Sequence, residues 1–491
     1  MTYLGPLDAA FLRMETKRTP MHVGALFTFR LPDNAPRHYL RDLFNYMRSQ
    51  PITTPPFNQR IVPSLLSKLM PSWEIAPRLD LDYHLRHSAL PYPGGERELG
   101  VLVARLHSHP MDMTRPLWEC HMIEGLENRR FAVYLKAHHA AVDGMRALKL
   151  IRNWLSQSPD EKSPPGPWAV KPRHKADPGA ASHDKGAASA NVLSHFAALA
   201  EDQIDAAAEL ARTMYRMSRR DENPEGGLLS ALATPRSLFN APVTAQRRLA
   251  TQLFELKRLK AIGKVAEATV NDVSLAIIGG AIRRYLLELN ALPEMSLIAS
   301  IPVGLPKTDD RGGNGVAGFV CPMSTNDPDP VKRLDLISTI TARTKMQIRN
   351  MSPAALAQFT LVGISPLLMG QMTGLLARMP PFFNVVVSNV VGSPHKLYFC
   401  GAELEAMFPV SVLFDGYALN VSIVGYADHL SIGFTGSRDV VPSLQRLAVY
   451  TGEALAELEN AYGLDPRGSE AVAGKARRPA RSRRAANTEV S

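Results

Sequence analysis

The sequence predicts a mixed α/β (α+β) protein with two lobes, and three observations lead to that prediction. Residues 1–155 alternate between the two-residue apolar period of strands and the longer apolar period of helices. Residues 156–243 begin with a proline-rich stretch that has neither period. The alternation resumes over residues 244–465. The chain has 491 residues, which leaves room for two domains at roughly 100–200 residues each.

The first lobe is expected to mix strands and helices. Apolar side chains at every second position predict a strand that contains Val23, Ala25, Phe27 and Phe29. Helical spacing predicts two helices, one carrying Leu40, Leu43, Phe44 and Met47 and the other carrying Leu99, Leu102, Val103 and Leu106. Two more strands are expected at Glu119–Ile123 and Phe131–Ala137.

The middle of the chain predicts a linker followed by a crossing helix. Six prolines between Ser156 and Ala190 are separated by Gly, Ser, Asp and Lys, which cannot build a core. An apolar stripe from Val192 to Met217 then predicts one long helix. In the second lobe we expect a helix at Asn271–Leu289, a last helix around Leu444–Leu458, and strands at Leu297–Val303, Phe383–Ser388, Leu419–Val424 and Leu430–Phe434.

The basic excess is concentrated at the C-terminus. The formal charge of the chain is +10, and residues 466–491 hold seven Lys or Arg against two Glu, or +5. Without apolar periodicity this segment is expected to be a disordered basic tail, which either touches an anionic phospholipid surface or simply stays solvated. Nucleic acid is not expected, because no aromatic or glycine-rich RNA motif accompanies the charge.

The cysteine pattern and the N-terminus predict a cytoplasmic protein. Cys120, Cys321 and Cys400 lie far apart and form neither a metal pair nor a disulfide framework. Asp8 and Arg13 interrupt the first residues before a signal peptide could form. The segment Asn350–Ala377 has no charged residue, but prolines and glycines interrupt it. We expect it to form a buried helix pair or the lining of a lipid tunnel rather than a transmembrane span.

The sequence His138-His139-Ala140-Ala141-Val142-Asp143-Gly144 carries the chemistry. It lies between a predicted strand and a predicted helix. Side chains of neighbouring strand residues point to opposite sides, so one imidazole is expected to face a cleft while the other braces the loop. A neutral histidine is suited to take a proton from a hydroxyl, Asp143 could orient a ring or fix the turn through a basic partner, and Gly144 would permit a tight turn.

Other chemistries find little support in the sequence. A zinc site would need a third ligand at a known spacing, and neither HExxH nor a Cys pair is present. Covalent catalysis is not favoured, because the chain has no GxSxG nucleophile elbow. The GxGxxG pattern at residues 313–318 precedes a predicted strand instead of a helix, so we do not interpret it as a nucleotide site.

The heptapeptide resembles the HHxxxDG motif of the CoA-dependent acyltransferase superfamily. Further blocks are similar to the bacterial wax ester synthase/acyl-CoA:diacylglycerol acyltransferase family and occur in the family's order from residue 4 to about 463. They are PLDAAFLRMET, Pro116-Leu117-Trp118, Asn271-Asp272, VSNVVGSP at Val387–Pro394, and MFPVSVLFDGYALNVSIVGYADHLSIGFTGSRDVVP. One block departs from the family's SNVPGP pattern, since Val391 and Ser393 replace both prolines.

The resemblance implies two chloramphenicol-acetyltransferase-like lobes with a substrate tunnel between them. It implies an O-acyltransferase that uses acyl-CoA as co-substrate, with no bound cofactor or metal. The acceptor would be a long-chain alcohol or diacylglycerol, and the product a wax ester or triacylglycerol. The protein would lie peripherally on the inner membrane or on lipid inclusions.

The resemblance also assigns roles to residues. His139 would be the general base, supported by His138 and Asp143, while Gly144, Asn271, Asp272, Ser388 and Asn389 would bind substrate. Asn271 and Asp272 equally suit the cap and first turn of a helix, and Ser388 and Asn389 could merely end a strand. Two alternatives stay open: the same fold acting on another acceptor or on a carrier-protein thioester, and a non-catalytic lipid-binding protein.

Overall fold

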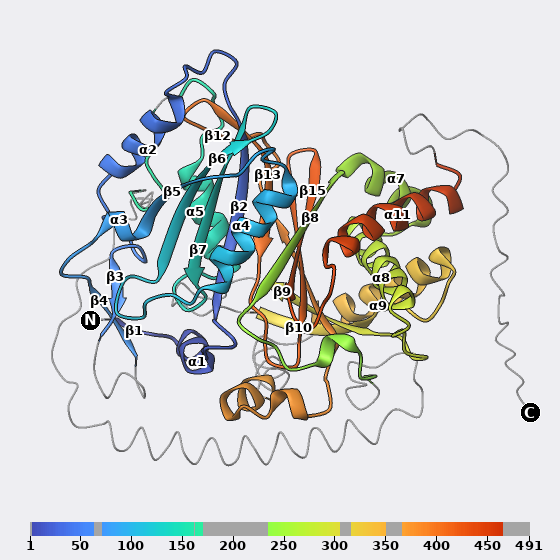
Figure 1. Ribbon diagram of the computed structural model, residues 1–491. Coiled ribbons are helices and arrows are strands. Elements are labelled where there is room, and N and C mark those ends of the chain that lie inside the picture. The colour runs from blue at the N-terminus through green and yellow to red at the C-terminus, as the bar shows by residue number, and fades with distance from the viewer. Residues whose placement is uncertain are drawn as a thin grey trace, which may run out of the picture.

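The computed structural model describes residues 2–62, 71–161, 163–169, 234–304, 316–349 and 366–464. Two six-stranded sheets, each with its own helices, form the two lobes (Figure 1). The expected mixed α/β fold with two lobes is therefore confirmed. The expected crossing helix at residues 192–217 and the basic tail at residues 466–491 lie outside the described residues.

The sheet of the first lobe runs in the order β12-β13-β2-β7-β6-β5. Its strands are β2 His22–Arg30, β5 Leu85–Ala89, β6 Trp118–Leu126, β7 Arg130–His138, β12 Tyr398–Phe399 and β13 Ala402–Val410. The helices of this lobe are α1 Pro6–Met14, α2 Tyr39–Ser49, α3 Leu81–His84, α4 Glu96–Ser108 and α5 Gly144–Trp154. A small sheet joins β1 Thr2–Tyr3, β4 Ser72–Ile75 and β3 Gln59–Ile61.

The strand alternation predicted for β2 separates two apolar layers. Phe27 and Phe29 face α5, where their rings lie 5.3 and 6.3 Å from the ring of Trp154. Leu26 faces the opposite layer, which contains Val103 of α4 and Leu249 of the second lobe. Because side chains alternate along a strand, one face of the first sheet is covered by α5 and the other meets the second lobe.

Strand β13 connects the lobes. It belongs to the C-terminal part of the sequence, yet it pairs antiparallel with β2 of the first lobe from Glu403↔Arg30 to Val410↔Gly24. The segments that we expected as separate lobes, 1–155 and 244–465, therefore share one sheet. Neither of these two segments by itself contains all the strands of the first sheet.

The sheet of the second lobe runs in the order β10-β9-β11-β14-β15-β8. Its strands are β8 Arg247–Glu255, β9 Ile298–Gly304, β10 Val316–Pro322, β11 Val385–Val391, β14 Leu419–Tyr426 and β15 His429–Ser437. Its helices are α7 Leu256–Ala266, α8 Val270–Glu288, α9 Pro330–Arg349 and α11 Gln445–Ala461, with short 3-10 helices η3 Leu238–Asn240 and η4 Leu376–Arg378. The second half of the GxGxxG pattern lies in strand β10, which begins at Val316, so no helix begins there, as expected for a chance occurrence.

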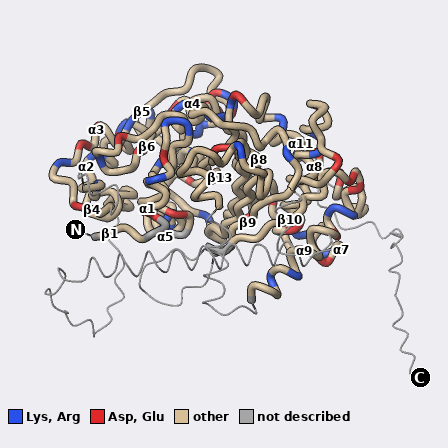
Figure 2. Tube along the Cα trace, turned by 90° about the horizontal axis from the view of Figure 1, so that it is seen from below, with Lys and Arg blue, Asp and Glu red and all other residues tan. Residues whose placement is uncertain are grey.

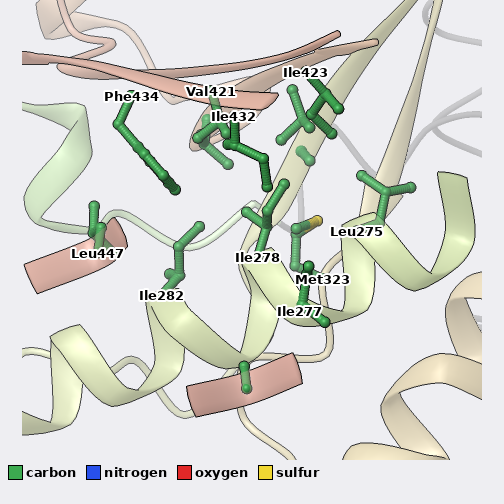
Figure 3. Close-up of a cluster of buried hydrophobic side chains, with 14 of the residues drawn as sticks. Leu275, Ile277, Ile278, Ile282, Met323, Val421, Ile423, Ile432, Phe434 and Leu447 are labelled. Carbon is green, nitrogen blue, oxygen red and sulfur yellow. The ribbon is translucent and has the colours of Figure 1, made fainter. Parts of the chain in front are cut away.

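The buried helix α8 organises the core of the second lobe. Leu275, Ile278 and Ile282 of α8 point toward the sheet, where they meet side chains of β14 and β15 such as Val421 and Ile432 (Figure 3). Thirteen of its residues are buried. Burial of such side chains stabilises each by about 1.5–3 kcal/mol.

The start of the linker is attached to the first lobe. Trp168 is buried and stacks on Trp118 with ring centroids 5.2 Å apart. Its Nε1 donates to the carbonyl of Gln50 at 3.3 Å. Trp168 is thus one of the residues that anchor the proline-rich segment to the first lobe.

No single helix among the described residues is long and apolar enough to cross a bilayer. In the described part of the chain, one pair of helices, α7 and α8, reaches that length and composition when taken together, and the two are bent by 101° relative to one another. Of the charge-free stretch Asn350–Ala377, residues 366–377 are described, and they form a helix over 366–373 and part of η4. Basic and acidic residues are interspersed over both lobes rather than separated by sign (Figure 2).

Candidate active site

The two histidines lie where β7 ends. His138 is the last residue of β7 and pairs with His22 of β2. The backbone N–H of His139 donates to the carbonyl of Met21 at 2.8 Å. Helix α5 then begins at Gly144, so residues 139–143 form a short loop between strand and helix, as the sequence predicts.

His138 uses both of its ring nitrogens within the protein. Its Nδ1 accepts from the N–H of Ala140 at 3.1 Å. The proton is therefore on Nε2, which donates to the carboxylate of Glu15 at 2.7 Å. Glu15 also accepts from the N–H of Met21 at 3.0 Å, so one carboxylate holds both the ring of His138 and the backbone that contacts His139.

His139 has a different environment. Its ring stacks on Phe11 of α1, with centroids 3.8 Å apart and planes 13° from parallel. Its Nδ1 is buried and finds no hydrogen-bond partner within the described part of the chain. Burial first, and the neighbouring His138 second, lower the pKa of the His139 ring to about 4. The ring is therefore neutral near pH 7 and able to accept a proton.

Asp143 fixes the turn after the histidines. It is the N-cap of α5, and its Oδ1 accepts from the N–H of Arg146 at 2.7 Å. The Arg146 side chain lies 3.5 Å from Oδ2 of Asp143 and 3.9 Å from Asp8 of α1. Of the two roles considered for Asp143, the described contacts correspond to fixing the turn with a basic partner.

Gly144 does not form the tight turn that we expected. It is the first residue of α5, and a Cβ placed on it would meet no atom within 4 Å. The position needs neither a left-handed backbone nor a close approach, so that prediction is wrong. Gly144 is exposed beside the histidine loop.

The start of α8 also differs from the capping expectation. The cap is Thr269, whose hydroxyl accepts from the N–H of Asp272 at 3.3 Å. Asp272 completes a capping box through the N–H of Thr269 at 2.9 Å and accepts from the Thr341 hydroxyl at 2.6 Å. Asp272 is therefore a buried structural residue of the first turn, as its alternative interpretation proposed, while Asn271 is not the cap.

Asn271 instead contacts a residue far away in the sequence. Its Oδ1 accepts from Nδ2 of Asn389 on β11 at 3.0 Å. The neighbouring Ser388 points to another partner, since its hydroxyl donates to Ser422 of β14 at 2.8 Å. The structure thus brings Asn271 and Asn389 together and places Asp272 and Ser388 in separate contacts.

The polar contacts described for these four residues do not join them to the histidine pair. Two hollows lie at the junction of the lobes, of about 250 and 310 Å³. Both include Gln252 of β8 and Phe408 of β13 in their lining, and the larger also includes Arg130. Neither is lined by His138, His139 or Asp143.

Sequence reasoning missed Glu15 and Phe11. Both lie in the block PLDAAFLRMET, which we singled out for its family resemblance without assigning a role to its acidic or aromatic residue. An acidic residue just after an apolar helix gives no local indication of its partner, because His138 lies 123 residues away. Among the described residues no group of His, Cys, Asp and Glu is arranged to hold a metal ion.

Comparison with known proteins identifies the family of the chain. Residues 4–274 match the family model of the wax ester synthase/diacylglycerol acyltransferase catalytic domain, and residues 312–459 match that of its C-terminal domain. A putative diacylglycerol O-acyltransferase of Mycobacterium tuberculosis is 46% identical over 94% of this chain and 99% of its own length. The O-acyltransferase WSD of Acinetobacter baylyi is 35% identical over 93% of this chain and 96% of its own.

Solved structures support the same family and fold. The wax ester synthase/diacylglycerol acyltransferase from Marinobacter aquaeolei VT8 superposes with a TM-score of 0.76 at 37% identity, covering 94% of this chain and all of that one. The first condensation domain of the calcium-dependent antibiotic synthetase, at 16% identity and a TM-score of 0.55 over 94% of this chain and 96% of its own, shares the fold. The chain belongs to the wax ester synthase/diacylglycerol acyltransferase family.

Proposed function

We propose that this protein is an acyl-CoA-dependent O-acyltransferase that esterifies a long-chain alcohol or diacylglycerol. Family membership over nearly the whole chain supports the reaction class. The observation that carries the proposal is His139, a half-buried imidazole that is neutral near pH 7 and whose Nδ1 has no partner within the described residues. Such a ring is available to a hydroxyl substrate, whereas both nitrogens of His138 are already used.

The reaction would proceed by direct transfer. The acceptor oxygen attacks the thioester carbonyl carbon while its proton passes to the ring of His139. When the tetrahedral intermediate collapses, the C–S bond breaks and His139 gives that proton to the departing CoA thiolate. The products are an ester and free CoA, and His139 returns to its neutral state. A low pKa favours the second half of this cycle, because the charged ring releases its proton readily.

The neighbouring residues would hold the base in place. Glu15 fixes the tautomer of His138 and also holds the backbone at Met21. The carbonyl of Met21 in turn accepts a hydrogen bond from the backbone N–H of His139. Asp143 fixes the end of the loop as the cap of α5. The open space beside Gly144 supports the approach of substrate at this point.

The assignment of substrate-binding residues in the second lobe is part of this proposal. Asn271 and Asn389 hold one another across α8 and β11, which supports a role in shaping the substrate side of the second lobe. Asp272 and Ser388 would act on substrate indirectly, through the first turn of α8 and through Ser422 of β14. Replacing Asn389 with Ala should therefore impair acceptor use more than replacing Ser388.

We also propose that the protein works at the surface of the inner membrane or of lipid inclusions. The +5 charge of residues 466–491 supports this location, at about 1 kcal/mol per basic residue near an anionic surface. A chain ending at Asp465 should bind vesicles that contain anionic phospholipid less well at low salt. Equal co-sedimentation of the truncated and the full chain would contradict this role of the tail.

An acceptor panel tests the reaction. Purified protein is supplied with labelled palmitoyl-CoA and either hexadecanol, dioleoylglycerol, or no acceptor, and labelled ester and free CoA are measured. Ester from either acceptor, lost in His139→Ala, is the expected result. Turnover only with a carrier-protein thioester would indicate a condensation enzyme, and lipid binding without ester would indicate a non-catalytic protein.

A further inference from the structure

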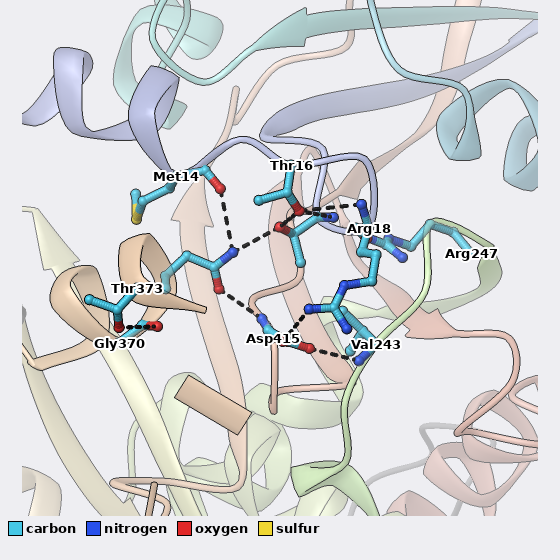
Figure 4. A network of polar contacts seen from close by, with 10 residues as sticks. Met14, Thr16, Arg18, Val243, Arg247, Gly370, Thr373 and Asp415 are labelled. Carbon is cyan, nitrogen blue, oxygen red and sulfur yellow. Dashed lines mark hydrogen bonds and ion pairs between the residues drawn. The ribbon is translucent and has the colours of Figure 1, made fainter. Parts of the chain in front are cut away.

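A second polar network lies on the other side of the segment that holds the histidines. The segment Met14–Met21 joins α1 to β2, and its Glu15 and Met21 contact His138 and His139. Other polar contacts of this segment run to the second half of the chain, to Gln371 and to Asp415 (Figure 4). The segment is therefore held between the histidine loop and residues more than 350 positions away.

Gln371 is the centre of this network. It lies in the helix at residues 366–373 and is 3% exposed. Its Nε2 donates to the Thr19 hydroxyl at 2.8 Å and to the carbonyl of Met14 at 3.4 Å. Its Oε1 accepts from the N–H of Asp415 at 2.9 Å. One buried amide thus bonds to both ends of the turn that carries Glu15.

Asp415 secures the same turn a second time. Its Oδ2 accepts from the Arg18 guanidinium at 3.2 Å, and its Oδ1 accepts from the N–H of Val243 at 3.0 Å. Arg247, which begins β8, donates to the carbonyl of Arg18 at 3.2 Å. The turn itself is closed by the Thr16 and Thr19 hydroxyls, 2.7 Å apart.

We propose that Gln371 is a positioning residue for the histidine pair and acts through Thr19 and the turn that carries Glu15. This inference rests on the proposed function. Glu15 can hold the ring of His138 at 2.7 Å only if its own backbone is fixed, and Gln371 supplies two of the contacts that fix it. Because a buried amide without partners is costly, the helix at 366–373 and the turn should keep one relative position. The second lobe would in this way set the geometry of the base in the first.

A double-mutant cycle tests the inference. Gln371→Met keeps the size of the side chain and removes its hydrogen bonds, and Glu15→Ala removes the carboxylate. If Gln371 acts through Glu15, Gln371→Met should lower kcat for palmitoyl-CoA and hexadecanol about 10- to 100-fold in the native chain. The same change should have little further effect in Glu15→Ala, because residues that act as a unit are not additive. If the two substitutions lower kcat in the double variant by the product of their separate factors, the inference is overturned.

Asn384 supplies a matched control. It is another buried amide of the second lobe, and it bonds to Pro235, Asn240 and Ile298 rather than to the turn. Asn384→Leu should lower thermal stability, and its effect on kcat should multiply with that of Glu15→Ala. If Gln371→Met fails to fold, Thr19→Val removes the same hydrogen bond from the other side and takes its place in the cycle.

A spectroscopic measurement separates this inference from the proposed reaction. The experiment uses protein with labelled histidines. The NMR signal of the Nε2 proton of His138 is assigned as the one that disappears in His138→Gln. We expect this signal to shift or broaden in Gln371→Met and in Thr19→Val, and to stay in place in Asn384→Leu, whether or not ester is formed. An unchanged signal in Gln371→Met and Thr19→Val would overturn the inference even in an active enzyme.

Discussion

At the scale of single residues, the two adjacent histidines differ in which nitrogens are free. His138 donates to Glu15 and accepts from Ala140, while the Nδ1 of His139 has no partner among the described residues. His139→Ala should therefore lower kcat about 10²- to 10⁴-fold, because it removes one proton-transfer group. The thermal stability of the variant should stay normal. Measurement of kcat and of the melting temperature checks this result.

His138 provides the control for that prediction. His138→Ala removes one of the hydrogen bonds of the Glu15 carboxylate and leaves the Ala140 N–H without its partner, so it should lower the melting temperature as well as activity. If His138→Ala abolished turnover in a stable protein while His139→Ala stayed active, the two roles would be reversed. If both variants stayed active, general-base catalysis by this pair would be wrong.

Three histidines with lowered pKa values predict how stability depends on pH. Burial, as the largest cause, lowers the pKa of His22 and His107 well below the usual value of 6.5, and lowers that of His139 to about 4. Between pH 6.5 and about 4 the unfolded chain binds protons that the folded chain does not. The free energy of unfolding should therefore fall as the pH is lowered through this window.

Urea unfolding at pH 7.5, 6.5 and 5.5 measures the predicted fall. His139→Ala removes one of the three groups, so its stability should depend less steeply on pH than that of the native chain. Equal stability at pH 7.5 and 5.5 would contradict the prediction, as would an identical slope in His139→Ala.

At the scale of helices and strands, Asp143 illustrates how a cap positions a loop. Its Oδ1 accepts the N–H of Arg146, and loss of such a cap costs about 1 kcal/mol. Asp143→Ala should lower both the free energy of unfolding and the activity, whereas Asp143→Asn keeps the accepting oxygen and should restore most of both. The ion pair to Arg146 contributes little, because that side chain is 49% exposed. An Asn variant as impaired as the Ala variant would show that the charge matters.

Two helical glycines give a matched test of packing around α8. A Cβ on Gly279 of α8 would lie 2.5 Å from the carbonyl oxygen of Met323, whereas on Gly100 of α4 the nearest atom would be 3.7 Å away. Alanine is the better helix former by about 1 kcal/mol. Gly100→Ala should therefore stabilise the protein, and Gly279→Ala should destabilise it. Chemical denaturation of both variants checks the sign, and a stabilised Gly279→Ala would contradict the described packing.

At the scale of the whole molecule, the lobes are not independent. Strand β13 lies beside β2, so a chain ending at Ala200 would expose the edge of β2 and the apolar layer that contains Leu26. Unpaired strand edges promote aggregation. Residues 1–200 expressed alone should be insoluble, while co-expression with residues 201–491 should recover soluble complex. A monomeric fragment 1–200 with cooperative unfolding would contradict this expectation.

The sequence by itself determined the elements whose periodicity is local. The strand through Val23–Phe29, the helix at Asn271–Leu289 and the HHAAVDG loop between strand and helix all lie where the apolar spacing predicts them. The family resemblance, based on ordered motifs, correctly indicated the two-lobed fold and the family. These features depend on neighbouring residues or on residue order, which a sequence contains directly.

Only the tertiary structure decided which distant residues meet. The pairing of β13 with β2, the carboxylate of Glu15 on His138, and the bond between Asn271 and Asn389 join positions more than 100 residues apart. Local spacing did not indicate that Thr269 rather than Asn271 caps α8, because both residue types suit a cap. The partner of a polar side chain depends on how sheets and helices pack, and that packing is a property of the whole chain.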